Sequence, residues 1–231
     1  MSGAPQDPRP ADLRADDPRP DDPRPDDVVR AAAVLQLLAT RSDEDHRWER
    51  PAAPTRWSAA RSLGHIADAL VLYGSLVATR ATGQRQPARD GRSAPPSGQL
   101  ADVEGAAAVL AATLRDLGDE VAWHPAGVAD AAGWAGMAVT EVLVHGVDVG
   151  RALEVVGLEL PEDVCERAVR RVFPWAAPSL EHHGAARVFL AVTGREDVEG
   201  IAHDPQWWWQ AAPLPQWDGR PRQRTRPPQW A

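Results

Sequence analysis

The long apolar segments between residues 28 and 192 repeat their apolar residues with the spacing of an α-helix. Residues 58–83 show this most clearly, since one stripe of that segment carries Leu63, Ile66, Leu70, Tyr73 and Val77. Alternation of apolar and polar residues, which marks a half-buried strand, is absent from every long segment. No strand is therefore expected, and the sequence predicts an all-α protein, a helical bundle with short connections.

Capping and helix-breaking residues place the boundaries of the predicted helices. Ser58 is a suitable N-cap, and Pro161 suits the first position of a helix. Residues 84–99 are a polar loop rich in proline and glycine, and residues 123–136 are expected to be irregular. The predicted helices span residues 28–41, 58–83, 102–117, 137–156, a segment from 161 onward, and 178–192.

The chain divides into a tail, a bundle and a second tail. Residues 1–27 hold seven prolines and eight aspartates and almost no large apolar side chains, so they are expected to be disordered, either as a docking tail or, the favoured interpretation, as a solvated extension. Residues 28–195 form the bundle. Residues 196–231 are a second tail rich in tryptophan, proline and arginine, which either straps over the bundle, the favoured interpretation, or lines a substrate pocket. The four tryptophans concerned are Trp207, Trp208, Trp209 and Trp217.

Charge and composition narrow the range of partners. The 25 basic and 33 acidic residues give a net charge of −8, which argues against nucleic acid and favours a small molecule. No apolar run approaches the length of a membrane span, and no signal peptide is visible, so neither a membrane nor export is expected and the protein is predicted to be cytoplasmic. All basic residues are arginine, and lysine and asparagine are missing, which is typical of a GC-rich genome such as an actinobacterial one.

Cys165 is the single cysteine, so the chain has no internal disulfide and no cysteine-based zinc site. Its apolar neighbours predict a small buried core residue rather than a reactive thiol. The closing arginines, Arg220 to Arg226, either bind an anionic group or, the favoured interpretation, form a solvated terminus. A metal ion in this protein would therefore need histidine, aspartate or glutamate ligands.

Glu141 and His145 are four residues apart in a predicted helix, so both side chains lie on one face and can bind the same cation. The spacing alone is weak support, because about one such pair is expected by chance in a chain of this composition, and a second pair, Glu199 and His203, is present. The first pair lies in an otherwise apolar helix, where an acid and an imidazole need a compensating partner. Asp148 shares that face, either as an acceptor that orients the imidazole or as a surface ion-pair partner of Arg151 or Arg167.

His65 lies between core positions in a helix with almost no charge. A lone histidine of this kind is more often a satisfied core residue than a ligand, with Asp68 one turn away as its partner. Gly146 and Gly150 lie one turn apart in the predicted helix 137–156, which indicates either the close approach of another helix or simple tolerance of glycine.

Two stretches, TRWSAARSLGHIADAL (55–70) and WAGMAVTEVLVHGVDVGRAL (134–153), resemble the metal-binding domain of mycothiol-dependent maleylpyruvate isomerases, a branch of the DinB-like helical bundles. The resemblance covers about residues 28–195. It implies a DinB-like four-helix bundle with additional C-terminal helices, in which His65, Glu141 and His145 are metal ligands and Asp148 is the motif's aspartate. The isomerase proper carries a second, α/β domain, whereas only a short tail is expected here, which argues against maleylpyruvate as the substrate.

Two histidines and one glutamate leave a coordination position open, as in catalytic zinc sites. The resemblance implies that mycothiol, a low-molecular-weight thiol, binds there and is presented as a thiolate to an electrophilic small molecule, in a thiol transferase or an isomerase. Two alternatives remain open at this point: a non-catalytic metal-binding or interaction bundle, and a metal-dependent hydrolase that needs no thiol.

Overall fold

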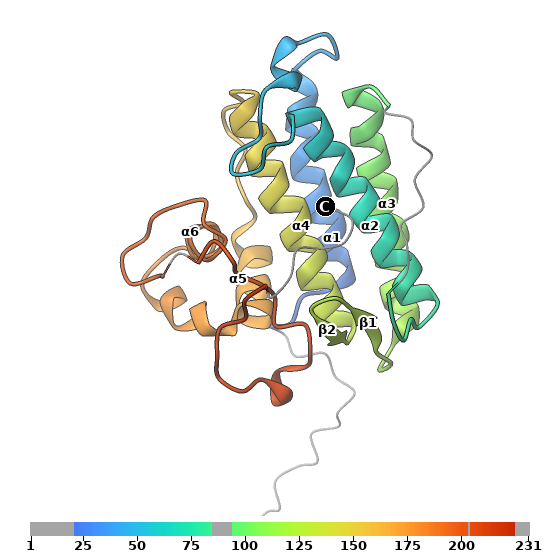
Figure 1. Ribbon diagram of the computed structural model, residues 1–231, viewed down its shortest axis with the longest axis vertical. Helices are drawn as coiled ribbons and strands as arrows, with labels where there is room; N and C mark the ends of the chain where they lie inside the picture. The colour runs from blue at the N-terminus through green and yellow to red at the C-terminus, as the bar shows by residue number, and fades with distance from the viewer. Residues whose placement is uncertain (1–20, 85–93, 203, 225–231) are drawn as a thin grey trace, which may run out of the picture.

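The structure is a computed structural model that describes residues 21–84, 94–202 and 204–224. Four helices lie side by side and form a bundle (Figure 1). They are α1 (Pro25–Val34), α2 (Ala59–Ala78), α3 (Pro96–Leu117) and α4 (Ala131–Ala152). Two more helices, α5 (Glu162–Val172) and α6 (Ala185–Val192), lie to one side, where α5 packs on α4 and α6 packs on α5. The prediction of an all-α bundle with additional C-terminal helices is confirmed.

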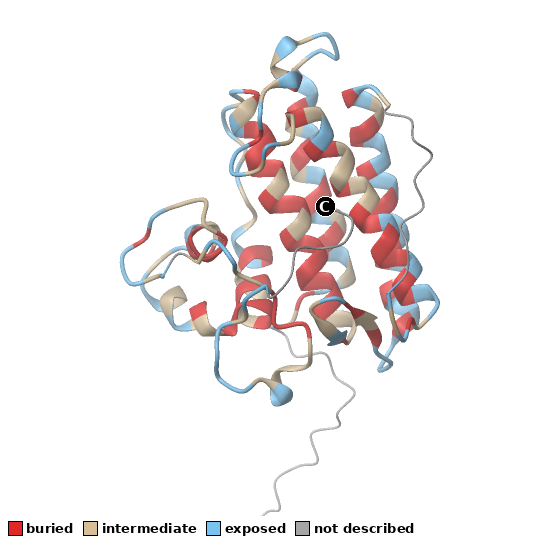
Figure 2. Ribbon diagram, viewed as in Figure 1, coloured by how far each residue is buried: buried red, intermediate tan, exposed pale blue. Residues whose placement is uncertain are grey.

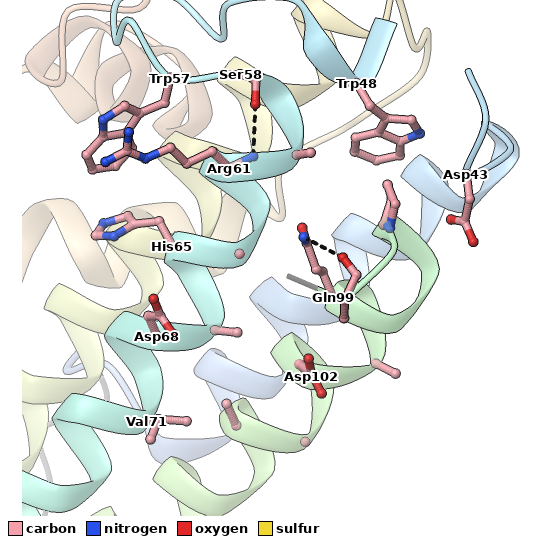
Figure 3. A pocket seen from close by; sticks show the side chains of 18 of the residues that line it. Asp43, Trp48, Trp57, Ser58, Arg61, His65, Asp68, Val71, Gln99 and Asp102 are labelled. Carbon is pink, nitrogen blue, oxygen red and sulfur yellow. Dashed lines mark hydrogen bonds between the residues drawn. The ribbon is translucent and has the colours of Figure 1, made fainter. Parts of the chain in front are cut away.

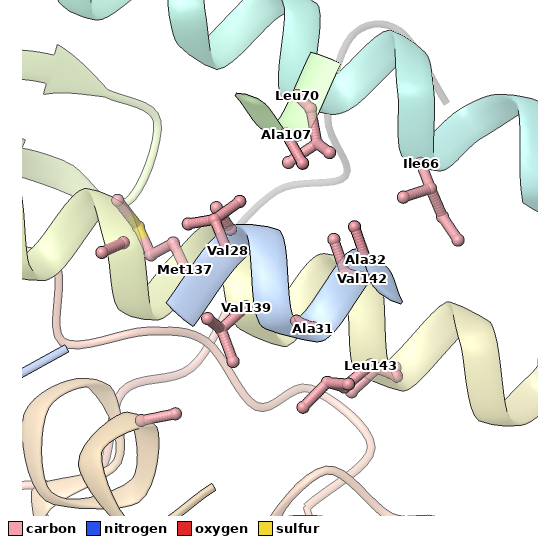
Figure 4. Packing of buried hydrophobic residues seen from close by; sticks show 14 of the residues in the cluster. Val28, Ala31, Ala32, Ile66, Leu70, Ala107, Met137, Val139, Val142 and Leu143 are labelled. Carbon is pink, nitrogen blue, oxygen red and sulfur yellow. The ribbon is translucent and has the colours of Figure 1, made fainter. Parts of the chain in front are cut away.

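Buried apolar residues line the inner faces of the four bundle helices (Figure 2). Val28 and Ala32 of α1 lie beside Met137 and Val142 of α4, and the group faces Leu70 of α2 (Figure 4). These side chains are at most 2% exposed. Each fully buried Val, Leu or Met side chain contributes about 1.5–3 kcal/mol of hydrophobic stabilisation. The apolar stripes that predicted the helices therefore also form the core.

Helices α1 and α4 approach closely at Gly146. A Cβ atom at this position would collide with the Cδ2 atom of Leu35, which follows α1 directly. At Gly150 the nearest atom, Cδ1 of Leu158, would lie 3.3 Å from an added Cβ, so this contact is less severe. The close approach of a neighbouring helix therefore explains Gly146.

Helix α1 begins at Pro25, three residues before the predicted start. The Asp27 carboxylate accepts a hydrogen bond of 2.9 Å from the backbone N–H of Arg24 and two of 2.7 and 2.8 Å from the Arg167 guanidinium of α5. Asp27 is 2% exposed, so the last residues of the predicted tail belong to the folded unit. Residues 1–20, where disorder was predicted, lie outside the described residues.

The segment expected to be irregular contains a β-hairpin and the start of α4. Strands β1 (Ala122–His124) and β2 (Gly127–Ala129) pair antiparallel, with Trp123 opposite Val128. The prediction that no strand occurs is wrong here, because strands of three residues are too short to show alternation. Asp130 then caps α4 by accepting a hydrogen bond of 2.8 Å from the Gly133 N–H, so the helix starts at Ala131, six residues before the predicted start.

Some of the remaining helix boundaries agree with the prediction, since α3 ends at Leu117 and α6 ends at Val192, but others differ by one turn or more. Helix α2 starts after the expected N-cap Ser58, whose Oγ accepts a hydrogen bond of 3.3 Å from the Arg61 N–H, but it ends at Ala78. Helix α3 starts at Pro96, inside the predicted loop. The predicted helix 28–41 continues after α1 as a 3-10 helix, and the predicted helix 178–192 begins as a 3-10 helix before α6. The 3-10 helices are η1 (Leu35–Thr40), η2 (His46–Glu49), η3 (Pro174–Glu181) and η4 (Leu214–Gln216).

The described part of the C-terminal tail packs on the bundle. Trp209 is 3% exposed, and Trp207 and Trp208 are partly buried against the core. The buried Arg171 guanidinium of α5 donates hydrogen bonds of 3.1 Å to the backbone carbonyls of both Gln210 and Ala211. These contacts support the favoured prediction, in which the tryptophans cover apolar surface. Within the described ranges, no helix has the length and apolar character needed to cross a membrane.

Candidate metal centre

Three side chains predicted to bind a metal meet between α2 and α4. His65 is on α2, and Glu141 and His145 are one turn apart on α4. Their ligand atoms all lie within 4.8 Å of one another. The Nε2 atom of His145 is 3.3 Å from Oε2 of Glu141, and Nε2 of His65 is 3.6 Å from the same oxygen. Across residues 21–84, 94–202 and 204–224, no other group of three such side chains is placed to share an ion.

The distances between these atoms fit a single small cation. Around a tetrahedral zinc ion with bonds of about 2.0–2.2 Å, neighbouring ligand atoms are separated by roughly 3.3–3.6 Å. The two nitrogen–oxygen distances, 3.3 and 3.6 Å, match this separation. The donor set of two imidazoles and one carboxylate also suits zinc or a similar borderline cation. The side chains present therefore fit the metal that the motif implies.

The site is sheltered but not closed. The three side chains are 13–15% exposed, and the ring of Trp57 lies 4.9 Å from the His65 ring and 6.5 Å from the His145 ring. The guanidinium of Arg61 stacks on the Trp57 ring, with its central carbon 4.7 Å from the ring centre (Figure 3). His65 and Trp57 also border a groove of about 1570 Å³ between α2 and α3, but Glu141 and His145 do not line it.

Electrostatics favour an anionic glutamate at the centre. Burial alone would raise the pKa of Glu141, but the polar contacts and charges of His145 and His65 hold this pKa well below its usual value. Glu141 is therefore a carboxylate at neutral pH, with two imidazole nitrogens directed at one of its oxygens. A cation between them would satisfy all three groups at once.

Asp148 is buried and does not form either predicted surface ion pair. Its carboxylate, 0% exposed, receives hydrogen bonds of 2.7 and 3.2 Å from Arg195, which lies beyond α6. Arg167 instead pairs with Asp27 and Asp163. Oδ2 of Asp148 lies 3.9 Å from Nδ1 of His145, too far for a hydrogen bond, and within the described part of the chain that nitrogen has no partner.

Two residues that were not predicted to belong to the site lie behind it, and one of them contacts Glu141. The Tyr73 hydroxyl donates a hydrogen bond of 3.2 Å to Oε1 of Glu141, and Nε2 of His124 lies 3.3 Å from the Tyr73 hydroxyl oxygen. Tyr73 follows His65 by two turns of α2, so helical spacing places it near the ligands, although its apolar stripe indicated only a core residue. His124 lies in the segment that was predicted to be irregular.

The other candidate residues lie away from the cluster. Glu199 is exposed, and its predicted partner His203 lies outside the described residues. Cys165 is buried on α5, and burial raises the pKa of its thiol to about 12, with Glu162 and Asp163 adding to the effect, so it is a poor nucleophile.

One arginine of the tail interacts with Glu141 through its charge. The Arg224 guanidinium lies 4.2 Å from the centre of the Trp208 ring. Partial burial lowers the pKa of Arg224, and the negative charge of Glu141 raises it, so this cation is within electrostatic reach of the site. By contrast, Arg222 pairs with Asp218, and Arg220 is exposed, as expected of a solvated terminus. Arg226 lies outside the described residues.

Comparison with protein families gives one match. The family model described as the mycothiol maleylpyruvate isomerase N-terminal domain matches residues 29–150, just over half of the chain. The matched segment contains the greater part of the four-helix bundle and all three side chains of the cluster. No curated protein and no solved structure gave a match to the chain.

Proposed function

The chain belongs to the mycothiol maleylpyruvate isomerase N-terminal domain family, and on this premise we propose that it is a metal-dependent enzyme that uses a low-molecular-weight thiol. Its metal would be a divalent cation, zinc by the chemistry of the ligands, held by His65, Glu141 and His145. Its thiol would be mycothiol, and its substrate an electrophilic small molecule. The reaction class is thiol transfer, or an isomerisation that proceeds by transient thiol addition.

The observation that carries this proposal is the convergence of three ligand atoms within 4.8 Å on a cluster that is still partly exposed. Three protein ligands are typical of catalytic zinc sites, whereas structural zinc sites usually have four. When bound, such an ion lowers the pKa of a thiol that coordinates to it and so supplies a thiolate at neutral pH. The buried Cys165 is unsuited to this role, which is consistent with a thiol that comes from outside the chain.

The protein's own groups have distinct parts in this proposal. His65 and His145 would bind through Nε2, the atoms that face Oε2 of Glu141. Trp57 shields the two imidazoles from bulk water, which strengthens electrostatic interactions within the site. Arg224 places a positive charge near Glu141 and suits a substrate or thiol with an anionic group. Asp148 would support the His145 ring, since only a small movement closes their 3.9 Å separation.

Thiol dependence is the test of the proposed function. Purified zinc-loaded protein is assayed with a panel of small electrophiles, including maleylpyruvate, with and without mycothiol. We expect consumption of an electrophile that requires both mycothiol and metal and that is lost in His145→Ala. The control is His46→Ala, because this histidine side chain is 80% exposed and lies away from the cluster.

Two other outcomes would contradict the proposal in different ways. Turnover that needs metal but no added thiol would identify a hydrolase that uses metal-activated water. Metal binding that changes the melting temperature but supports no reaction with any electrophile of the panel would identify a non-catalytic metal-binding bundle.

A further inference from the structure

Glu141 uses its two carboxylate oxygens differently. Oε2 faces Nε2 of both His65 and His145, whereas Oε1 accepts a hydrogen bond of 3.2 Å from the hydroxyl of Tyr73. Tyr73 is 3% exposed, so water does not compete for this bond. One oxygen of the carboxylate is thus held by Tyr73, and the other is directed toward the two histidines.

The hydrogen bonds behind Tyr73 all run in one direction. The backbone N–H of Ala126 can only donate, and it donates 3.0 Å to Nδ1 of His124. A neutral imidazole that accepts at Nδ1 carries its proton on Nε2, and Nε2 of His124 lies 3.3 Å from the Tyr73 oxygen. His124 therefore donates a hydrogen bond to the Tyr73 oxygen, and the single hydroxyl proton of Tyr73 is donated to Glu141.

Packing against aromatic rings fixes both His124 and Tyr73. His124 is 2% exposed, and its ring contacts those of Trp134 and Trp209 edge-on, with centres 5.1 and 5.6 Å apart. The Tyr73 ring contacts the Trp134 ring in the same way at 5.2 Å. Burial lowers the pKa of His124 to about 3, which keeps the ring neutral.

We infer that Tyr73 and His124 are positioning residues that make Glu141 a one-oxygen ligand and so keep a coordination position of the metal open. This inference rests on the proposed metal site. A carboxylate is able to bind a cation through one oxygen or through both, and a second metal–oxygen contact would occupy the position that the thiol needs. Because Tyr73 holds Oε1, only Oε2 is directed toward the ion. His124 acts through Tyr73, whose hydroxyl oxygen lies 3.3 Å from its Nε2 atom.

Cobalt binding to the full chain tests this inference without an activity assay. Co²⁺ affinity is measured by competition with a chelator, and the visible absorption of bound Co²⁺ reports its coordination number. For Tyr73→Phe, we expect an affinity about 10-fold or more lower, the usual effect of removing a residue that orients a ligand. We also expect an absorption spectrum that shifts from that of four-coordinate cobalt to the weaker one of five-coordinate cobalt.

A double-mutant cycle separates positioning from a general structural effect. His124→Phe should weaken cobalt binding in the wild-type background but not in the Tyr73→Phe background, because it acts only through the tyrosine hydroxyl. The control is Thr113→Val on α3, which removes a hydroxyl that bonds to the Val109 carbonyl at 2.8 Å. It should leave both cobalt affinity and spectrum unchanged.

The outcomes are distinguishable. Wild-type cobalt affinity and spectrum in Tyr73→Phe would overturn the inference and leave the metal site standing, as would effects of the two substitutions that simply add. If the wild-type chain binds no cobalt at all, the metal site itself is wrong and the inference falls with it.

Discussion

The guanidinium of Arg195 holds the carboxylate of Asp148 with hydrogen bonds of 2.7 and 3.2 Å, one turn of α4 beyond His145. The two side chains are 7% and 0% exposed. A fully buried ion pair therefore connects the segment after α6 to the helix that carries two of the three proposed ligands.

Replacing Asp148 by Asn should strongly destabilise the protein. The change leaves the buried Arg195 charge without a counter-charge, and breaking a buried pair in this way costs about 3–5 kcal/mol. Urea denaturation of the apoprotein measures the free energy of unfolding. If Asp148 also supports the His145 ring, zinc affinity in the folded variant should fall about 10-fold.

The matched control for this change is Glu196→Gln. It breaks the pair between Glu196 and Arg187, whose side chains are 33% and 55% exposed, respectively. Exposed pairs of this kind contribute about 0–1 kcal/mol. Equal effects of the two substitutions on unfolding would contradict the importance assigned to the Asp148–Arg195 pair.

Gly146→Ala should destabilise the bundle by about 1–3 kcal/mol, the usual cost of overpacking a core. The added methyl group would collide with the Leu35 side chain, which is fully buried, so Leu35 or the segment that carries it would have to shift. Thermal denaturation followed by circular dichroism measures the effect. Gly105→Ala on α3 is the control, because nothing lies within 4 Å of its added Cβ, and alanine should stabilise that helix by about 0.5–1 kcal/mol. A Gly146→Ala variant as stable as this control would show that the two helices do not pack closely.

Burial of neutral His124 predicts a specific dependence of stability on pH. The pKa of His124 is about 3 in the folded chain and about 6.5 when unfolded, so between these values the unfolded chain binds one more proton. This residue therefore costs stability as the pH falls below about 6.5, by up to about 1.4 kcal/mol per pH unit, and the cost is constant below about 3.

Comparison of His124→Phe with the wild type isolates this effect. The difference in their free energies of unfolding should change in favour of the variant between pH 7 and pH 4.5. A control substitution, His46→Phe, removes an exposed histidine and should leave the wild-type pH dependence intact. A constant difference between His124→Phe and wild type over this range would mean that His124 is not buried in its neutral form.

The bundle and the Glu141–His145 pair were predictable because their signals are local or repeat along the chain. The stripe of α2 predicts a helix that buries one face, and the Glu141–His145 spacing places two side chains on one face of α4. His65 followed only from the resemblance of its motif, since a lone histidine in an apolar helix gives no reason to expect a ligand.

Residues that act through tertiary contacts were missed. Arg195 reaches Asp148 from 47 positions away, and no local pattern connects the two. His124 reaches Tyr73 from a hairpin whose strands are three residues long, too short to show alternation. The early start of α4 was also missed, because its first turns contain two glycines and a tryptophan, which are weak helix formers, and depend on the Asp130 cap and on burial.

The central claim is that His65, Glu141 and His145 together hold a single divalent ion, and zinc titration of metal-free protein by calorimetry tests it most directly. The wild-type chain and His46→Ala should each bind one zinc ion per chain, and His65→Ala, Glu141→Ala and His145→Ala should each lose that binding while remaining folded by circular dichroism. Unchanged zinc binding in all three variants, or no stoichiometric binding by the wild-type chain, would contradict the account.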